Sequence, residues 1–343
     1  MKQTRKNLLC ALATLLLTVL LIGLSSPILM MKNSADQYQD FYRMDVDYDV
    51  LFLGTSHVMN GVSPMELWAE TGIRSYNLSG PGTRMGTEYW MLKNALERAY
   101  PAVVVLDCAL LRDEKTNRNL EYNHIVFDTM PLGLTKIQAV FDLFADNGSR
   151  LQMLFPFLLY HSRWSELTAA DFRDHGNAMC GFGPAFVTKP LARDSILTEL
   201  PETVADLNNQ STAYLERIAD LCAERGITLV LTCLPTTETE EASAELGWVH
   251  AFAAERDLLF LGPDLLGKDL DPEQDFADDS HVNIRGARKI TSALGVQLSR
   301  TFDLPGTDAP VARQFWEERL TAYHAELHAL EQAQPEETDG MRE

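Results

Sequence analysis

Two short polar segments, far apart in the chain, carry the residue types of a nucleophilic active site. The sequence GTSH at 54–57 follows a continuous apolar run, and DDSH stands at 278–281, near the other end of the chain. A serine hydroxyl is a weak nucleophile and needs an adjacent base. An Asp and a His three residues apart in a turn can present both side chains to one side, so that the carboxylate orients the imidazole. Taken singly, each segment could also be a turn serine or a helix-capping aspartate, but together they make Ser56, Asp278 and His281 the candidates for a triad.

Alternating strand and helix patterns predict the frame that must hold these residues. Short apolar runs that are typical of buried strands occur at 50–53, 103–106, 227–231 and 258–261. A further strand candidate at 75–78 is closed by a turn-rich segment. Helical spacing of apolar residues occurs at 64–70, 88–99, 214–225, 246–255 and 284–294. Strands that alternate with helices predict a parallel sheet covered on both faces, which is a three-layer α/β/α domain. Ligands of such sheets bind at the carboxyl ends of the strands, where Ser56 stands.

The domain boundaries follow from where this alternation begins, breaks and ends. It runs from residue 46 to 303 and is interrupted between about 112 and 203, which predicts a large insertion over the carboxyl edge of the sheet. We assign 33–45 to a linker and 304–343 to a C-terminal helix with a disordered tail. The apolar stripe of that helix either packs back onto the domain or contacts a partner or a membrane surface.

The N-terminus has the charge pattern of a membrane anchor. Lys2, Arg5 and Lys6 precede an uncharged apolar stretch from Leu8 to Met31, and about 20 such residues cross a bilayer. The positive cluster should stay cytoplasmic. Residues 1–32 are therefore a cytoplasmic N-terminus and a single-pass transmembrane anchor in the cell membrane, with the catalytic domain on the extracytoplasmic face. A cleaved signal peptide is the alternative, because 24–26 offers small residues near the end of the apolar run.

Composition restricts the partners and cofactors. The formal net charge is −20 and the pI about 4.8, which argues against a nucleic-acid partner. Five cysteines form no CxxC pair, and no metal-ligand spacing occurs, so neither a metal nor a cofactor is expected. Two disulfides are one interpretation of the four cysteines outside the anchor. Buried free thiols are the simpler one, because Cys108 and Cys233 end apolar runs.

In this order on this fold, the two polar segments resemble the SGNH/GDSL hydrolase superfamily over residues 46–303. That family has a G-D-S-type block after its first strand and a C-terminal D-x-x-H block. Here Thr55 stands where an aspartate is usual. The resemblance implies a flavodoxin-like α/β/α fold and a serine esterase or acyltransferase.

The same resemblance assigns the groups that would stabilise the oxyanion. Residues 77–82 (NLSGPG) resemble the family's second block, which implies that the N–H of Gly82, or alternatively of Gly80, donates to the oxyanion together with the N–H of Ser56. The third block, G-x-N-D, has no counterpart at 106–110. Arg84 or the insertion would then supply the missing donor.

The GTSH form, the anchor and the outward domain resemble one branch of that superfamily, which includes the D-alanine transfer protein of teichoic acid synthesis and alginate O-acetyltransferase proteins. The resemblance implies that an acyl group, such as acetyl or alanyl, moves through acyl-Ser56 onto an extracellular polysaccharide or teichoic-acid-like polymer. It also implies a membrane-bound O-acyltransferase as partner. An esterase or polysaccharide deacetylase with the same triad is one alternative, and a non-catalytic accessory protein of an O-acyltransferase complex is the other.

Four further residues are candidates for contact with substrate. His57 adjoins the nucleophile, although neighbouring residues on a turn often point apart. In the insertion, His161, Arg163 and Trp164 stand together. A guanidinium can hold a phosphate or carboxylate of a polymer, and an indole can stack on a sugar. An ordinary amphipathic segment with one buried aromatic is the alternative for these three.

Overall fold

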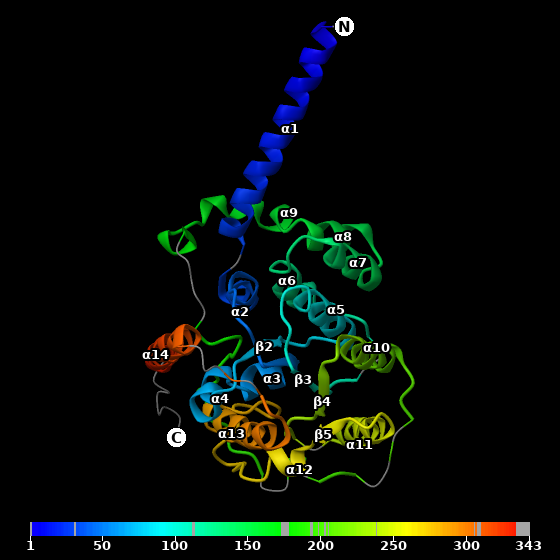
Figure 1. Cartoon of the computed structure of the whole chain (residues 1–343), viewed down its shortest axis with the longest axis vertical. Coiled ribbons are helices and arrows are strands. Elements are labelled where there is room, and N and C mark those ends of the chain that lie inside the picture. The colour runs from blue at the N-terminus through cyan, green and yellow to red at the C-terminus, as the bar shows by residue number, and fades with distance from the viewer. Residues whose placement is uncertain are drawn as a thin grey trace, which may run out of the picture.

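A five-stranded parallel sheet forms the centre of the protein (Figure 1). The computed structural model describes residues 2–333 apart from 31, 112–113, 173–177, 193–194, 198, 202–203, 205, 238, 305 and 307–309. The strands are β1 (Val50–Gly54), β2 (Ser75–Ser79), β3 (Val103–Asp107), β4 (Thr228–Thr232) and β5 (Leu259–Leu261). Their order, β2-β1-β3-β4-β5, is that of flavodoxin-like sheets, and the predicted three-layer α/β/α class is confirmed.

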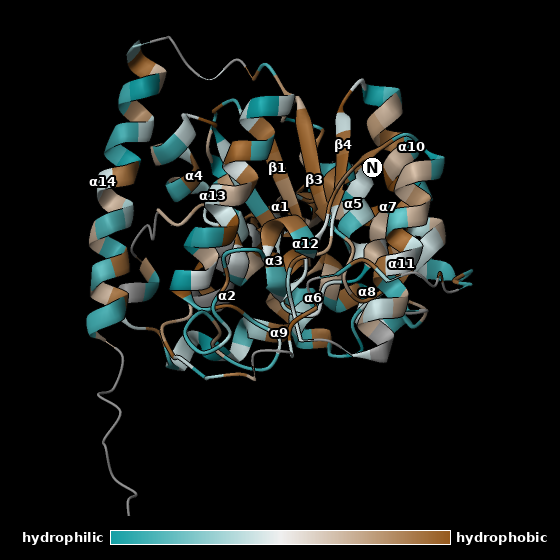
Figure 2. Cartoon of the chain, turned by 90° about the horizontal axis from the view of Figure 1, so that it is seen from below, coloured by the Kyte–Doolittle hydropathy of each residue, from teal (hydrophilic) through white to brown (hydrophobic). Residues whose placement is uncertain are grey.

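The strands β1, β2 and β3 are buried along their whole length because both faces of the sheet are covered. Every residue of β1, β2 and β3 is buried, as expected where helices pack on both sides. In Figure 2 the central strands are almost uniformly hydrophobic, whereas the helices around them are mixed. This difference explains why the strands could be predicted as short continuous apolar runs.

Helices pack against both faces of the sheet. The connections β1–β2 and β2–β3 run in opposite directions along the sheet, so right-handed crossovers place their helices on opposite faces. One layer contains α4 (Pro64–Thr71) and α13 (Ile284–Thr301), which pack together. The other contains α5 (Met85–Ala95) and α10 (Gln210–Arg225), which also pack together. Two further helices, α11 (Glu240–Glu255) and α12 (Pro263–Leu266), flank β5 in sequence.

The C-terminal helix α14 (Pro310–Gln332) packs against the domain beside α4. Its apolar stripe is buried at Trp316, Tyr323 and Leu327. The ring of Trp316 lies 5.5 Å from that of Trp68, and the Tyr323 hydroxyl is 3.2 Å from the Oγ of Ser63. Of the two interpretations of this stripe, packing against the domain is the one that the structure shows.

Two helices precede the sheet. Within the described residues, one helix is long and apolar enough to cross a membrane, at Gln3–Leu29, inside α1 (Lys2–Leu29). This finding fits an anchor and also a signal sequence. The assignment of 33–45 to a linker is corrected, because α2 (Lys32–Arg43) buries Tyr38 and Phe41 in the core. Two aromatics one helical turn apart give this short helix a face to bury.

The insertion divides into two parts. Its first part contains α6 (Leu120–Phe127), α7 (Leu134–Leu143), α8 (Asn147–Leu154), α9 (Phe157–Tyr160) and the 3₁₀ helices η1 (His161–Ser165) and η2 (Ala169–Phe172). These elements contact α5, α2 and α1 rather than the sheet edge. The second part runs past the edge, where the N–H of Gly183 donates to Met59 and that of Leu197 to Thr236, each at 2.9 Å. The predicted cover over the carboxyl edge therefore applies mainly to this second part, while the first part reaches the edge through Asn117, which donates to the carbonyl of Gly82 at 2.9 Å.

Candidate active site

Ser56 is the first residue of a short helix that begins directly after β1. This helix, α3 (Ser56–Gly61), is capped by Thr55, whose Oγ1 accepts the N–H of His57 at 3.2 Å. A Cβ on Gly54 would lie 2.5 Å from the side chain of Val58 and 2.9 Å from that of Asp107. Glycine is thus required where the strand turns sharply into the helix, and the turn leaves Ser56 only partly buried at the carboxyl edge of the sheet.

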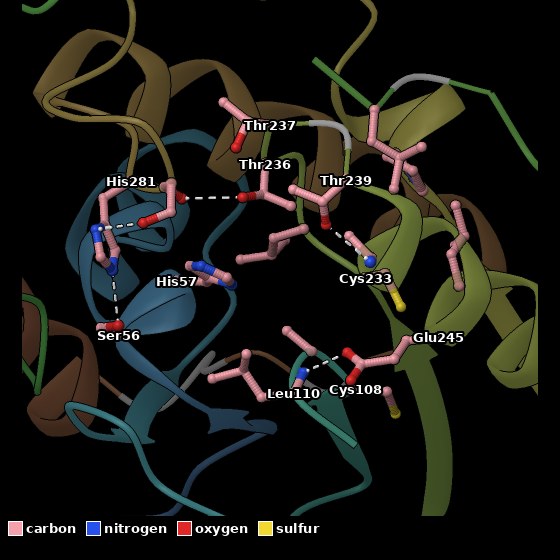
Figure 3. A pocket seen from close by; sticks show the side chains of 17 residues that line it. Ser56, His57, Cys108, Leu110, Cys233, Thr236, Thr237, Thr239, Glu245 and His281 are labelled. Atoms are coloured by element: carbon pink, nitrogen blue, oxygen red, sulfur yellow. Dashed lines mark hydrogen bonds between the residues drawn. The ribbon is translucent and has the colours of Figure 1, made fainter. Parts of the chain in front are cut away.

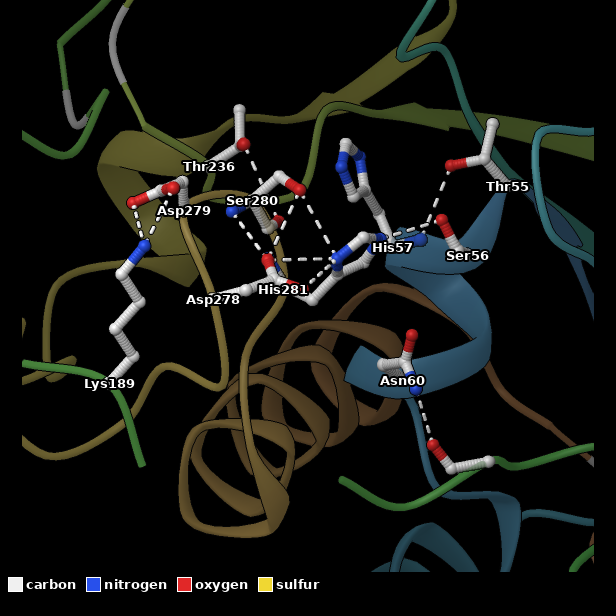
Figure 4. Close-up of polar contacts among 11 residues, drawn as sticks. Thr55, Ser56, His57, Asn60, Lys189, Thr236, Asp278, Asp279, Ser280 and His281 are labelled. Atoms are coloured by element: carbon white, nitrogen blue, oxygen red, sulfur yellow. Dashed lines mark hydrogen bonds and ion pairs between the residues drawn. The ribbon is translucent and has the colours of Figure 1, made fainter. Parts of the chain in front are cut away.

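The structure brings Ser56, His281 and Asp278 together in the geometry of a nucleophile, a base and an orienting acid (Figure 4). The Oγ of Ser56 lies 2.7 Å from Nε2 of His281. On the other side of the ring, Nδ1 lies 2.8 Å from Oδ2 of Asp278. Because the carboxylate is an acceptor, Nδ1 carries a proton, which leaves Nε2 free to accept the serine proton.

The turn that presents His281 is fixed on several sides. Phe276 and Val282 form an isolated antiparallel bridge across it. Asn283 caps α13, its Oδ1 accepting from the N–H groups of Arg285 and Gly286. Lys189, from the second part of the insertion, pairs with the neighbouring Asp279 at 2.7 Å. The turn that carries the imidazole is therefore fixed by its own bridge, by the start of α13 and by the insertion.

Burial and hydrogen bonding shift the pKa values of two groups beside His281, Asp278 and His57. Burial acts to raise the pKa of Asp278, but the backbone N–H groups of Ser280 and His281 and the imidazole outweigh it, and the pKa falls below its usual value. Burial, followed by repulsion from His281, lowers the pKa of His57 to about 4. His57 is consequently uncharged at neutral pH and does not compete for the carboxylate.

A pocket of about 330 Å³ opens beside Ser56 and His281 (Figure 3). His57 lines it, with its ring centroid 5.3 Å from that of His281, and its Nδ1 makes no hydrogen bond with any described residue. The floor is mainly apolar, and its side chains come from the ends of β3 and β4 and from α11: Cys108, Ala109, Leu110, Cys233, Leu234 and Leu246. Thr236, Thr237, Thr239 and Glu245 add polar groups. Of the residues predicted to contact substrate, His57 is the one that lines this pocket.

Of the two glycines predicted as oxyanion donors in the loop after β2, Gly80 has its N–H engaged and Gly82 stays the candidate, and neither residue lines the pocket. The N–H of Gly80 already donates to the carbonyl of Gly54 at 3.3 Å. Gly82 has φ +59, and an added Cβ would lie 2.0 Å from Nδ2 of Asn117. That amide donates to the Gly82 carbonyl at 2.9 Å. Asn117, which the sequence did not single out, therefore holds this loop.

Arg84 lies inside the protein and does not line the pocket. Its side chain is buried, and its charge acts on Glu88, whose pKa burial raises well above the usual value. Asp107, at the end of β3, shares this buried region, and burial raises its pKa to about 7. The expectation that Arg84 contacts substrate is not supported, because its neighbours are these buried carboxyl groups. Sequence reasoning also passed over Asp107, although its place directly after an apolar strand was visible.

The structure places His161, Arg163 and Trp164, which were predicted to contact substrate, away from the pocket beside Ser56. The Nη1 of Arg163 donates to the carbonyls of Leu29 and Met30 at 2.6 and 2.7 Å, so the guanidinium caps the C-terminal end of α1. Trp164 is 72% exposed, and none of the three residues lines the pocket. They lie in η1, which contacts α1.

The cysteines of this protein do not compete with Ser56 as nucleophiles. All five cysteines are free, and the four outside α1 are buried. Burial raises the pKa of Cys108 and Cys233 well above the usual value, so neither is a thiolate at neutral pH. Among the described residues, no three His, Cys, Asp or Glu side chains are grouped so that they could hold a metal ion.

The fold and the site define an α/β/α protein with a serine–histidine–aspartate arrangement at the carboxyl edge of its sheet. No family model and no curated protein matches the sequence. Among solved structures, the chain is similar to a GDSL-like lipase from Bacteroides thetaiotaomicron VPI-5482 and to a protein assigned as an acylhydrolase from Bacteroides fragilis NCTC 9343. Each is 10% identical with a TM-score of 0.39, over 79% of this chain and 98% or 99% of theirs. These are distant similarities, and they assign no activity to this chain.

Proposed function

We propose that this protein transfers acyl groups through a covalent intermediate on Ser56. The observation that carries the proposal is the continuous contact from the Oγ of Ser56 to His281 at 2.7 Å and on to Asp278 at 2.8 Å. An adjacent, oriented base is what converts a serine hydroxyl into a nucleophile. A non-catalytic accessory role would not require this alignment.

The chemistry proceeds in two balanced steps. Ser56 attacks an ester carbonyl while His281 takes its proton, and Asp278 stabilises the imidazolium. The N–H groups of Ser56 and Gly82 would stabilise the oxyanion. His281 then gives the proton to the departing alcohol, which leaves acyl-Ser56. In the second step His281 deprotonates an acceptor hydroxyl, which attacks the acyl carbonyl; the bond to the Oγ of Ser56 breaks, and His281 returns the proton to that oxygen.

For the acceptor, we propose a hydroxyl of a cell-surface polymer, with a membrane-bound O-acyltransferase as the source of acyl groups. Two features support a polymer rather than a membrane lipid. Two of the helices that line the pocket, α11 and α12, lie at the end of the molecule opposite to α1 (Figure 1). A pocket of about 330 Å³ is at the small end of ligand sites, which suits a short acyl group.

A serine-directed fluorophosphonate probe tests the proposal on the detergent-solubilised full chain. Wild type should be labelled, Ser56→Ala should lose the label, and His281→Ala should react far more slowly because the base is gone. Ser165→Ala, which removes an exposed serine in η1, is the matched control and should label like wild type. Equal labelling of wild type and Ser56→Ala would refute a nucleophilic Ser56.

The acceptor is tested by following a radiolabelled acyl group from an activated ester. A transferase should hydrolyse acyl-Ser56 slowly in water and should pass the group to added cell-wall polymer, with faster turnover. Fast hydrolysis that no polymer diverts would identify an esterase and would leave the role of Ser56 intact.

A further inference from the structure

We propose that the surface formed by α8, α9, η1 and η2 rests in the lipid bilayer where α1 leaves it. The protein would then be held by an interfacial surface as well as by a single helix. This proposal goes beyond the chemistry of Ser56 and depends on α1 being inserted in the membrane.

The first support is the position of these short elements around the end of α1. α9, η1 and η2 all contact α1, and in Figure 1 they lie across the foot of the long N-terminal helix. Arg163 fixes the arrangement, since its Nη1 binds the Leu29 and Met30 carbonyls and its Nη2 binds Oδ1 of Asp171 at 3.0 Å. The surface therefore has a defined position relative to the anchor.

The second support is the kind of side chain that this surface exposes. Six large apolar residues are between 40% and 72% exposed: Leu151, Phe155, Leu158, Leu159, Trp164 and Phe172. Single exposed apolar residues are normal, whereas a group of them on consecutive elements marks an interaction site. Tryptophan is enriched where membrane meets water, because its ring is apolar with one polar N–H.

The third support is the level of this surface along α1, which indicates that lipid is what covers it. A second pocket, of about 570 Å³, lies between α1 and the domain and is lined by α1 residues from Val19 to Met30. Phe155 and Phe157 line it from the domain side. At 1.5 Å per residue, Val19 to Met30 spans about 16 Å, roughly half of a hydrocarbon core of about 30 Å. If α1 spans the bilayer, Phe155 and Phe157 lie at the interface where it ends, next to the charged Arg43, Asp128 and Lys136 that line the same pocket.

Spin labels on the full chain in zwitterionic nanodiscs test this placement. Cys10 is the one exposed cysteine, so a Cys10→Ala background allows labelling at Leu158→Cys, Trp164→Cys and Phe172→Cys. Leu16→Cys in α1 is the membrane control, and Val296→Cys, exposed on α13, is the aqueous control. We expect the ratio of collisions with oxygen to collisions with a water-soluble nickel chelate to be several-fold higher at the three surface sites than at position 296.

Each other outcome overturns the proposal in a recognisable way. Nickel accessibility like that of position 296, with Leu16 in lipid, would show that the surface stands in water. A water-accessible Leu16 would remove the anchor and the docking together. Protection from both collision partners would indicate a second copy on this surface. Fluorophosphonate labelling of Ser56 should be unchanged in all these variants, so failure of the docking is separable from failure of the proposed chemistry.

Intrinsic fluorescence gives an independent check without labels. Lipids brominated near the headgroup should quench wild-type emission, and Trp164→Phe should lose most of that quenching. Trp248→Phe, in α11 at the other end of the molecule, is the matched control and should retain it. Quenching that is the same in Trp164→Phe and wild type would contradict the docking.

Discussion

The carboxylate of Asp278 holds His281 at two points. Its Oδ1 accepts the backbone N–H of His281 at 2.8 Å, and its Oδ2 lies 2.8 Å from the ring Nδ1. The backbone and the imidazole are therefore fixed by one group, which keeps Nε2 directed at the Oγ of Ser56. Losing this carboxylate should cost orientation and charge stabilisation together.

Asp278→Asn should fold but should lower the rate of Ser56 acylation by about three to four orders of magnitude, as in other triads whose aspartate is replaced. The matched control is Asp279→Asn, which changes the adjacent carboxylate that pairs with Lys189 and should keep most of the rate. Fluorophosphonate kinetics measure both. Similar rates for the two variants would mean that Asp278 does not orient the base.

Gly82→Ala should damage the proposed oxyanion loop. The new Cβ would meet Nδ2 of Asn117 at 2.0 Å, and φ +59 is unfavourable for alanine. Displacement of one oxyanion donor costs about 10²–10³ in rate, so acylation should fall by that order. Gly133→Ala, with no atom within 4 Å of the added Cβ, is the control. A normal rate in Gly82→Ala would place the oxyanion donor elsewhere.

Asp107→Asn should change how stability depends on pH. Burial raises the pKa of Asp107 to about 7, whereas an unfolded aspartate titrates near 3.9. Between these values the folded state binds the extra proton, so this group makes wild type less stable as pH rises from about 4 to 7. A three-unit shift corresponds to at most about 4 kcal/mol. Relative to wild type, the free energy of unfolding of Asp107→Asn should therefore rise by up to that amount between about pH 4 and pH 7.

Urea unfolding in detergent at several pH values measures this difference. The exposed Asp303→Asn is the control and should keep a constant offset from wild type. If the offset of Asp107→Asn is also independent of pH, then Asp107 titrates normally in the folded protein.

Arg163→Ala should act on the anchor and not on catalysis. It removes hydrogen bonds to the carbonyls of Leu29 and Met30, so hydrogen exchange should increase at the end of α1 while Ser56 labelling and polymer-dependent turnover stay normal. Arg118→Ala, at a side chain 89% exposed, is the control. A selective loss of polymer-dependent turnover would restore Arg163 as a substrate-binding residue.

The sequence was enough to predict the sheet, because each strand has its own local pattern. It was also enough to predict that Ser56, Asp278 and His281 lie together. Buried parallel strands are short apolar runs, and their carboxyl ends meet at one edge, so a serine after β1 and a histidine before α13 are brought to the same place. The order of the elements along the chain was enough to infer this.

The contacts of Arg163 and Gly82 were not predictable because they are made with residues remote in sequence. A cation beside a histidine and a tryptophan has the composition of a binding site, yet Arg163 binds backbone carbonyls more than 130 residues away. Asn117 reaches Gly82 across 35 residues, with no pattern that marks the pair. Residues 33–45 were predicted to be a linker because they are mostly polar. The segment is too short for the helical spacing of its few apolar residues to outweigh that composition.

The most direct test of a covalent Ser56 intermediate is the mass of the protein quenched in acid after brief exposure to an activated acyl ester. The proposal predicts one added acyl group, located by peptide mass at Ser56, formed slowly in Asp278→Asn and absent in Ser56→Ala. An adduct on another residue, or the same adduct mass in Ser56→Ala, would contradict it.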